Sequence, residues 1–415
     1  MEASTILTII LIIITADFLF EQLLDYLNFK HQKPKLPDEL KDIYDKEKYE
    51  KSVAYNKTRA RFSFFTDSLS FVIYFLLIAL GIFGLLDEAL GNFFSNPVWL
   101  ALAFFGVLFI ASEIFSLPFQ WYSTFVIEEK FGFNKTDKKT FVLDQLKGLL
   151  LAVIIGGVLI GTLLYLILSI GPSFWIYFWL VITAFMLFMN LFYASLIVPL
   201  FNKLTPLPEG ELKTAIEEYS KKVSFPITNV FVIDGSKRST KANAFFSGLG
   251  KRKKVVLYDT LIENHTNEEL LSVLAHEVGH YKKKHIITGL GAGIIQTGIT
   301  LFIMSLMIFS PKLSAALGSD QLAFHLNLIG FAILYSPISK LTGLLMNVVS
   351  RKNEYQADAY ATHTYNGNAL QNALKKLSVN NLSNLLPHPW YVFWHYSHPP
   401  LLKRLHAIDK ENMTA

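Results

Sequence analysis

The chain has 415 residues, of which 52% are hydrophobic and only 17% charged, so it is too apolar for an ordinary soluble protein. It contains no cysteine, which excludes disulfides, thiolate catalysis and cysteine-ligated zinc. The net charge of +5 gives no indication of nucleic acid as a partner. Any metal site must therefore use histidine and carboxylate ligands.

Stretches of about 20 mainly apolar residues predict membrane-spanning helices, and we count seven of them. In chain order they are Ser4–Tyr26, Ser63–Leu86, Val98–Trp121, Gln145–Ile170, Phe174–Pro199, His285–Ser310 and Leu322–Val349. We expect an N-terminal membrane domain of five spans over residues 1–199. A second domain over residues 200–415 would include the last two spans, at about 285–310 and 322–349.

Lysine and arginine gather in alternate loops between these spans. The rich segments are Lys30–Arg61, Lys130–Lys147, Lys203–Lys284 and the tail from Arg351. Because positively charged loops stay in the cytoplasm, the N-terminus is expected outside and the C-terminus inside. The candidate site residues described below would then lie toward the cytoplasmic face.

The polar stretch between the fifth and sixth spans is expected to fold. Residues Glu209–Val223 have the apolar spacing of an amphipathic helix. Short strands are predicted at Val230–Ile233, Ala242–Ser247 and Val255–Tyr258. We expect these strands to form a small antiparallel sheet, with a hairpin tip at residues 248–254.

A helix that follows the sheet carries the most informative motif. Thr266 and Glu269 form a T-x-x-E capping box that predicts its start. His276 and His280 lie four residues apart, so both imidazoles can point at one metal ion. Glu277 lies beside them, where a carboxylate can take a proton from water. This spacing is typical of a zinc peptidase; the alternative is a pair of surface histidines.

A catalytic zinc usually has three protein ligands, and the third is expected further along the chain. Glu354 and Asp358 lie four residues apart, so Glu354 can bind the metal while Asp358 accepts the outer N–H of a ligating histidine. Asn353 is a second candidate for this supporting role. The alternative is a solvated acidic face. Two histidines and one glutamate suit zinc better than cobalt or manganese, and we expect one zinc ion per chain.

Two further features are candidates for handling a substrate. His398, which precedes a Pro-Pro pair, can stabilise a tetrahedral oxyanion, or it can be an ordinary tail histidine before a rigid turn. Asn243 and Ala244 belong to a predicted strand. This strand can be an edge that pairs with a peptide backbone, or a strand with no such role.

These motifs, in this order, resemble the type I CAAX prenyl protease family, which comprises integral-membrane zinc metalloproteases. Beyond the helix with the paired histidines, the resemblance rests on Tyr122–Thr136, Pro199–Pro208, Asn243–Phe245, Glu354–Asp358 and Ser397–Pro400 with Arg404. It implies a mainly α, multi-pass membrane protein in which about seven transmembrane helices enclose a chamber. A small α+β zincin-like metalloprotease domain, of the gluzincin type, would accompany them.

The resemblance also implies roles for individual residues. His276, His280 and Glu354 would bind zinc. Glu277 would be the general base. The remaining roles belong to three residues that handle the substrate: Asn243 would hold its backbone, His398 would stabilise the oxyanion, and Arg404 would support substrate or transition-state groups.

An enclosed chamber would also explain why polar residues occur within apolar spans. The polar residues concerned are Asp17, Glu113, Asn190 and Gln296. Such side chains are costly when they face lipid, so they are expected to face the interior of the protein. Hydrogen bonding between neighbouring helices is the alternative for each of them.

The function implied is a membrane-embedded zinc metalloendopeptidase that removes the C-terminal tripeptide of prenylated CAAX proteins or peptides. One alternative is a quality-control protease that acts on unprenylated membrane proteins. Another, from a different class, is a transporter with a structural zinc site. The expected partners are a peptide or protein substrate and membrane lipid. The C-terminus, Asn412–Ala415, has no dilysine signal, so we expect a bacterial inner-membrane protein, or an endoplasmic reticulum protein if the source is eukaryotic.

Overall fold

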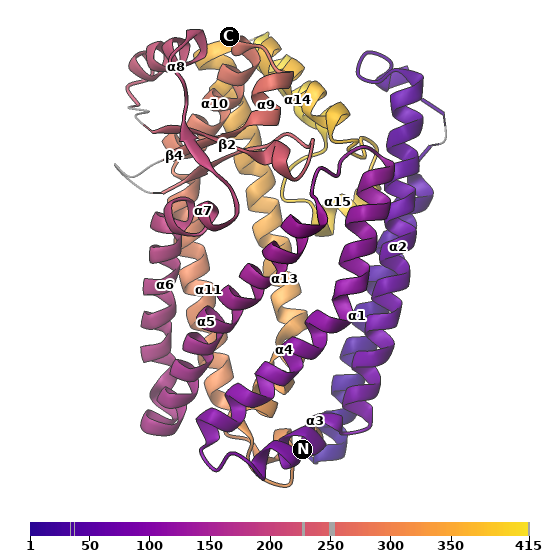
Figure 1. Ribbon diagram of the computed structural model, residues 1–415, viewed down its shortest axis with the longest axis vertical. Coiled ribbons are helices and arrows are strands. Elements are labelled where there is room, and N and C mark those ends of the chain that lie inside the picture. The colour runs from indigo at the N-terminus through magenta and orange to yellow at the C-terminus, as the bar shows by residue number, and fades with distance from the viewer. Residues whose placement is uncertain (34, 37, 226–228, 249–253, 414–415) are drawn as a thin grey trace.

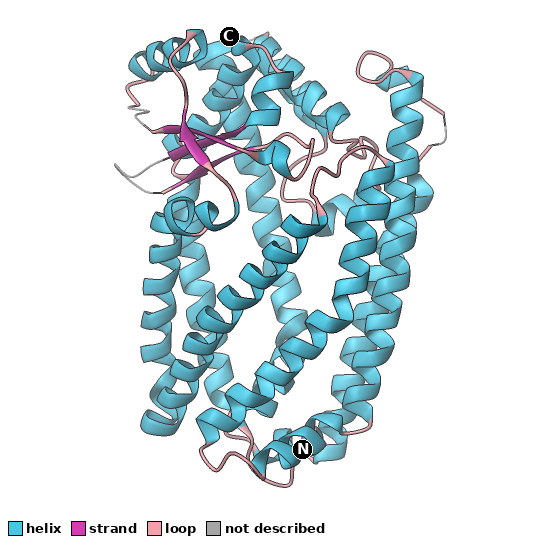
Figure 2. Ribbon diagram, viewed as in Figure 1, coloured by secondary structure: helices cyan, strands magenta, loops and turns pink. Residues whose placement is uncertain are grey.

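The computed structural model describes residues 1–33, 35–36, 38–225, 229–248 and 254–413. Long helices extend along the long axis of the molecule, and a small sheet with several shorter helices lies at one end (Figure 1 and Figure 2). The C-terminus lies at the end that holds the sheet, and the N-terminus lies at the opposite end. The prediction of a mainly helical protein is confirmed, and a small sheet accompanies the helices.

The long helices correspond to the apolar stretches of the sequence. They are α1 (Ala3–His31), α2 (Lys46–Ala79), α4 (Pro97–Tyr122), α5 (Lys138–Ile170), α6 (Phe174–Leu196), α11 (His285–Met307) and α13 (Phe324–Ala361). In the described part of the chain, six helical stretches are long and apolar enough to cross a membrane. One of these stretches, residues 138–201, contains both α5 and α6. The count of seven spans stays a prediction.

The second predicted span is interrupted, because α2 ends at Ala79 and α3 (Ile82–Gly91) begins after Gly81. Gly81 has φ +66°, a left-handed conformation that favours glycine. A Cβ on Gly84 would lie 1.9 Å from the carbonyl oxygen of Gly318, so the two backbones approach closely here. Hydropathy gives no sign of this contact between two backbones, so one continuous helix was predicted from the sequence.

Two of the four polar residues predicted within the spans, Asp17 and Gln296, make contacts between helices. Asp17 of α1 forms an ion pair with Lys340 of α13. Gln296 of α11 donates a hydrogen bond to Thr342 of α13 over 3.0 Å. A cavity of about 550 Å³ also lies among α1, α2 and α13, and Asp17 lines it. Both readings of these residues therefore have support, and the continuous chamber stays a prediction.

Within the described residues, the sheet has four strands in the spatial order β1-β2-β4-β3. They are β1 (Leu204–Pro206), β2 (Val230–Ile233), β3 (Ala244–Ser247) and β4 (Lys254–Tyr258). The prediction of an antiparallel sheet was wrong in part, because β2 and β4 pair in parallel while the outer pairs are antiparallel. The sequence missed β1, which is short and contains Pro206. Most of the predicted hairpin tip lies outside the described residues.

The remaining helices are shorter, and most lie at the end of the molecule that holds the sheet, but the one at Pro311–Ala316 packs against α1 at the opposite end. They are α7 (Val198–Phe201), α8 (Glu211–Lys222), α9 (Asp259–Asn264), α10 (Asn267–Lys282), α12 (Pro311–Ala316), α14 (Gly367–Asn380), α15 (Pro389–His395) and α16 (Leu401–Asn412). Two π-helical segments, Ser123–Glu128 and Thr362–Asn366, follow α4 and α13. One buried core unites α8, α10, α14, α16 and the sheet. Because α13 runs from the bundle into this region, it carries bundle and site residues on one continuous helix.

Candidate metal centre

Helix α10 starts at the residue that the sequence predicted. The Thr266 hydroxyl accepts a hydrogen bond from the Glu269 N–H over 3.2 Å, and the Glu269 carboxylate accepts one from the Thr266 N–H over 2.9 Å. This capping box satisfies two N–H groups that the first turn would leave unpaired. The apolar stripe of Leu270, Leu274 and Val278 is buried in the core. The cap and the stripe together set the orientation of the helix.

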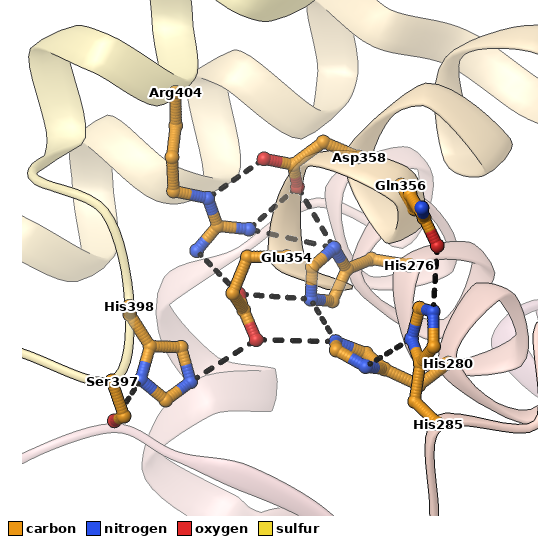
Figure 3. A network of polar contacts seen from close by, with 9 residues as sticks. All are labelled: His276, His280, His285, Glu354, Gln356, Asp358, Ser397, His398 and Arg404. Carbon is orange, nitrogen blue, oxygen red and sulfur yellow. Dashed lines mark hydrogen bonds and ion pairs between the residues drawn. The ribbon is translucent and has the colours of Figure 1, made fainter. Parts of the chain in front are cut away.

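The paired histidines lie where α10 packs closely against α13. Gly279 lies just before His280, and a Cβ at this position would lie 3.0 Å from the Cα of Ala357. Glycine therefore lets the two helix backbones approach. Glu354, one turn before Ala357 on α13, is thereby brought to His276 and His280 (Figure 3).

The three predicted ligands lie together. The Nε2 atoms of His276 and His280 are 3.2 Å apart. Glu354 Oε1 lies 3.2 Å from His280 Nε2, and Glu354 Oε2 lies 3.6 Å from His276 Nε2. All the candidate donor atoms lie within 4.8 Å of one another. Figure 3 shows these side chains converging on one point.

This donor set fits a tetrahedral metal ion. Two ligand atoms 2.0–2.1 Å from one zinc ion, at a tetrahedral angle, lie roughly 3.3 Å apart. The distances between the donor atoms are close to this value. Glu354 is only 4% exposed, and its Oε2 has no hydrogen-bond partner among the described residues, although Arg404 Nη1 lies 3.5 Å away. A buried carboxylate oxygen of this kind suits a cation as its partner.

Asp358 lies beside His276, in the position that its predicted supporting role requires. Its Oδ1 lies 2.8 Å from His276 Nδ1, so the carboxylate can accept the outer N–H of the ring. Arg404 donates two hydrogen bonds to the Asp358 carboxylate, of 2.8 and 2.6 Å. Burial alone would lower the pKa of Arg404, but Asp358 outweighs burial and raises that pKa above its usual value. The guanidinium thus stays charged and holds Asp358 in place.

His280 has a second support that the sequence did not reveal. His285, the first residue of α11, has its Nδ1 3.1 Å from His280 Nδ1, and its Nε2 lies 2.9 Å from Gln356 Oε1. Lys284 adopts a left-handed conformation with φ +61°, which turns the chain back so that His285 meets His280. The sequence signal was a third histidine five residues after His280, but its partner Gln356 is distant in the chain.

The direction of the hydrogen bonds from His280 through His285 to Gln356 follows if His280 is a metal ligand. If Nε2 of His280 binds a metal, its Nδ1 carries the proton and donates to His285 Nδ1. His285 then carries its own proton on Nε2 and donates to the Gln356 carbonyl oxygen. Two effects act on the pKa of His280. Burial would lower this pKa, but the neighbouring Glu354 carboxylate raises it above its usual value.

Replacing His285 by Phe should weaken metal binding about 10- to 100-fold, because His280 loses the acceptor that orients its ring. The dissociation constant would be measured by competition with a chromophoric chelator. His363→Phe is a suitable control, since His363 is exposed and pairs with Glu411 away from the cluster. Equal metal affinities for wild type and His285→Phe would show that His285 does not orient His280.

A cavity of about 420 Å³ adjoins the donor atoms and is lined by Glu277, His398 and Asn243. Glu277 is half-buried, and its carboxylate makes no hydrogen bond to any described residue. The His398 side chain is 64% exposed, with its Nε2 3.3 Å from Glu354 Oε1. Apolar side chains complete the wall, among them Val273, Ile286, Leu370, Leu374 and Leu377.

Three other predicted site residues are placed less directly. Ala244 begins the edge strand β3 and lines the same cavity. Asn353 makes no hydrogen bond to the cluster within the part of the chain that the structure describes. Arg404 lines the cavity, but its guanidinium contacts Asp358 and Glu354, so its position suggests support of the metal ligands rather than direct substrate contact.

Comparison with known proteins gives one consistent result. Residues 25–203 match the family model described as CAAX prenyl protease N-terminal, five membrane helices. Residues 206–412 match the model of peptidase family M48. The chain is 37% identical to CAAX prenyl protease 1 homolog of Oryza sativa over 94% of each chain. It is 36% identical to CAAX prenyl protease 1 of Saccharomyces cerevisiae, covering 95% of this chain and 93% of that protein.

A solved structure has the same fold. The crystal structure of S. mikatae Ste24p superposes with a TM-score of 0.92 at 34% identity, covering 97% of this chain and 99% of that one. The relatives named here are eukaryotic, so the expectation of a bacterial source and a bacterial inner membrane is not supported.

Proposed function

Because the chain belongs to the CAAX prenyl protease 1 family within peptidase family M48, and is thus a multi-pass membrane metalloendopeptidase, we propose that it removes the C-terminal tripeptide of prenylated CAAX substrates. The observation that carries the proposal is the convergence of His276, His280 and Glu354 on one point beside a cavity that Glu277 lines. Three donors beside an open cavity suit a catalytic metal site rather than a filled structural one.

Zinc is the metal that we propose for these ligands, one ion per chain, because two imidazoles and one carboxylate in tetrahedral spacing are a typical zinc set. When bound, such an ion supplies Lewis acidity to the scissile carbonyl and to the attacking water. Asp358 and Arg404 hold the His276 ring, while His285 and Gln356 hold the His280 ring. Hydrogen bonds to neighbouring side chains thus orient both histidine ligands.

The chain's own residues then handle the protons and the substrate. Glu277 takes a proton from the attacking water and later gives it to the leaving amine. His398 lines the cavity and its ring is exposed, so its N–H can donate a hydrogen bond to the developing oxyanion. Asn243 and Ala244 precede and begin an edge strand, to which an extended substrate can add by backbone hydrogen bonds.

We further propose that residues 200–415 form the metalloprotease domain, which includes the helices at 285–307 and 324–361. The alternation of Lys- and Arg-rich loops supports a site that faces the cytoplasm. We favour the endoplasmic reticulum membrane as the location, because the relatives named above are eukaryotic. The exposed apolar side chains of the long helices suit contact with membrane lipid.

A farnesylated CAAX peptide incubated with the purified protein should lose its last three residues, and mass spectrometry of the products would show the cleavage position. Removal of the metal with a chelator should stop the reaction, and zinc should restore it. Cleavage of the unprenylated peptide at an equal rate would instead favour a quality-control protease. No cleavage of either peptide by the metal-loaded protein would contradict the proposal.

A further inference from the structure

A second cavity, of about 570 Å³, adjoins the candidate active site, because His398 lines both cavities. It lies among α1, α2, the segment after α14 and the segment after α15. Its volume is within the range of small-ligand sites, roughly 300–1,000 Å³. We call it the polar pocket and define its polar wall by Asn28, Arg59, Lys241, Asn381, Asn384 and His398.

The direction of the edge strand relates this pocket to the substrate. Antiparallel pairing is the more stable arrangement of two strands, so a bound peptide is expected to run opposite to β3. Its C-terminal part then passes Asn243 and continues toward Lys241, which lines the polar pocket. Asn381 holds Ala242 by two hydrogen bonds of 3.1 and 3.2 Å, so this end of the strand is rigidly placed.

Among the described residues that line the polar pocket, Arg59 is the strongly basic side chain without an acidic partner. Lys241 Nζ lies 2.7 Å from Glu128 and 2.8 Å from Tyr55 Oη, so its charge is already neutralised. Arg59 is exposed, and it contacts only the Tyr55 side chain, through a 3.4 Å hydrogen bond and the face of the ring. Within the described residues, no carboxylate pairs with it. Asp25 also lines the pocket and would repel an anion, so Arg59 is the group that favours an anionic ligand here.

We propose that the polar pocket receives the residues that follow the scissile bond and that Arg59 binds the free C-terminal carboxylate of the substrate. A guanidinium suits a carboxylate because it can donate two parallel hydrogen bonds. Three extended residues span roughly 10 Å, so this contact would fix the distance between the chain end and the cleaved bond. The inference rests on the proposed function and adds the feature by which the enzyme locates the third bond from the end.

The test compares two CAAX peptides that differ only at the C-terminus, one with a free carboxylate and one with a carboxamide. For the wild-type protein, the amide should raise KM about tenfold or more, with a smaller change in kcat. Arg59→Gln should raise KM for the free acid by a similar factor and leave KM for the amide unchanged. Arg59→Lys keeps the charge and should restore part of the preference.

Arg61→Gln is the matched control, because Arg61 lies two residues further on the same helix and stacks over the Phe29 ring. This variant should keep the wild-type preference for the free acid. Equal KM values for acid and amide with the wild-type protein would overturn the inference while leaving the proposed function intact. An unchanged preference in Arg59→Gln would also overturn it. Failure to cleave either peptide would instead count against the proposed function.

Discussion

Replacing Glu277 by Gln should abolish peptide cleavage while the metal remains bound. The glutamine has nearly the same shape, but it cannot take a proton from water. Because a positioned general base contributes about a hundred- to ten-thousandfold to the rate, kcat should fall by that factor. Glu277 is not among the donors that converge on one point, so metal content should stay at the wild-type level.

The two measurements for this variant are the rate of product formation and the metal content by elemental mass spectrometry. Glu263→Gln is a matched control, since Glu263 is exposed on the short helix α9 and does not line the cavity. A Glu277→Gln protein that cleaved peptide at the wild-type rate would contradict the assignment of the base. Loss of metal together with activity would show instead that Glu277 serves the ligand set.

Replacing Glu354 by Gln should remove both the metal and the activity. Loss of a hydrogen-bonded support of a ligand costs about 10- to 100-fold in affinity, so loss of a ligand itself should cost more than about 100-fold. The amide also removes the negative charge that lies 3.2 Å from His280 Nε2. The buried Arg404, which lies 3.5 Å from Glu354 Oε2, keeps Asp358 as its partner, so the fold should persist.

Competition with a chelator would measure the affinity of this variant, and circular dichroism would verify its helical content. Glu218→Gln is a suitable control, because Glu218 is an exposed carboxylate on α8. Stoichiometric metal in purified Glu354→Gln at wild-type affinity would exclude Glu354 as the third ligand. Asp358 would then be the next carboxylate to replace.

Measuring both the rate and the metal content of these variants separates loss of the catalytic base from loss of metal binding. Glu277→Gln should keep the metal and lose the rate, whereas Glu354→Gln should lose both. His285→Phe should lie between them, with weaker metal binding that excess zinc can overcome. The three variants therefore distinguish a base, a ligand and a residue that orients a ligand.

Local features of this chain were predictable from the sequence because each depends on residues close together in it. The capping box at Thr266 and Glu269 and the four-residue spacing of His276 and His280 both follow from helix geometry. Apolar length alone placed the long helices, although one of them is interrupted at Gly81, whose left-handed φ of +66° hydropathy does not reveal. The third ligand, Glu354, was proposed from its four-residue spacing to Asp358, and the resemblance to a known family pointed to the same residue.

Contacts between distant segments were decided only by the tertiary structure. The parallel pairing of β2 with β4, the support of His280 by His285 and Gln356, and the two hydrogen bonds from Arg404 to Asp358 all join parts of the chain that no periodicity relates. Spacing along one helix determines which side chains share a face. The packing of α10 on α13, made possible by Gly279, determines which carboxylate that face meets.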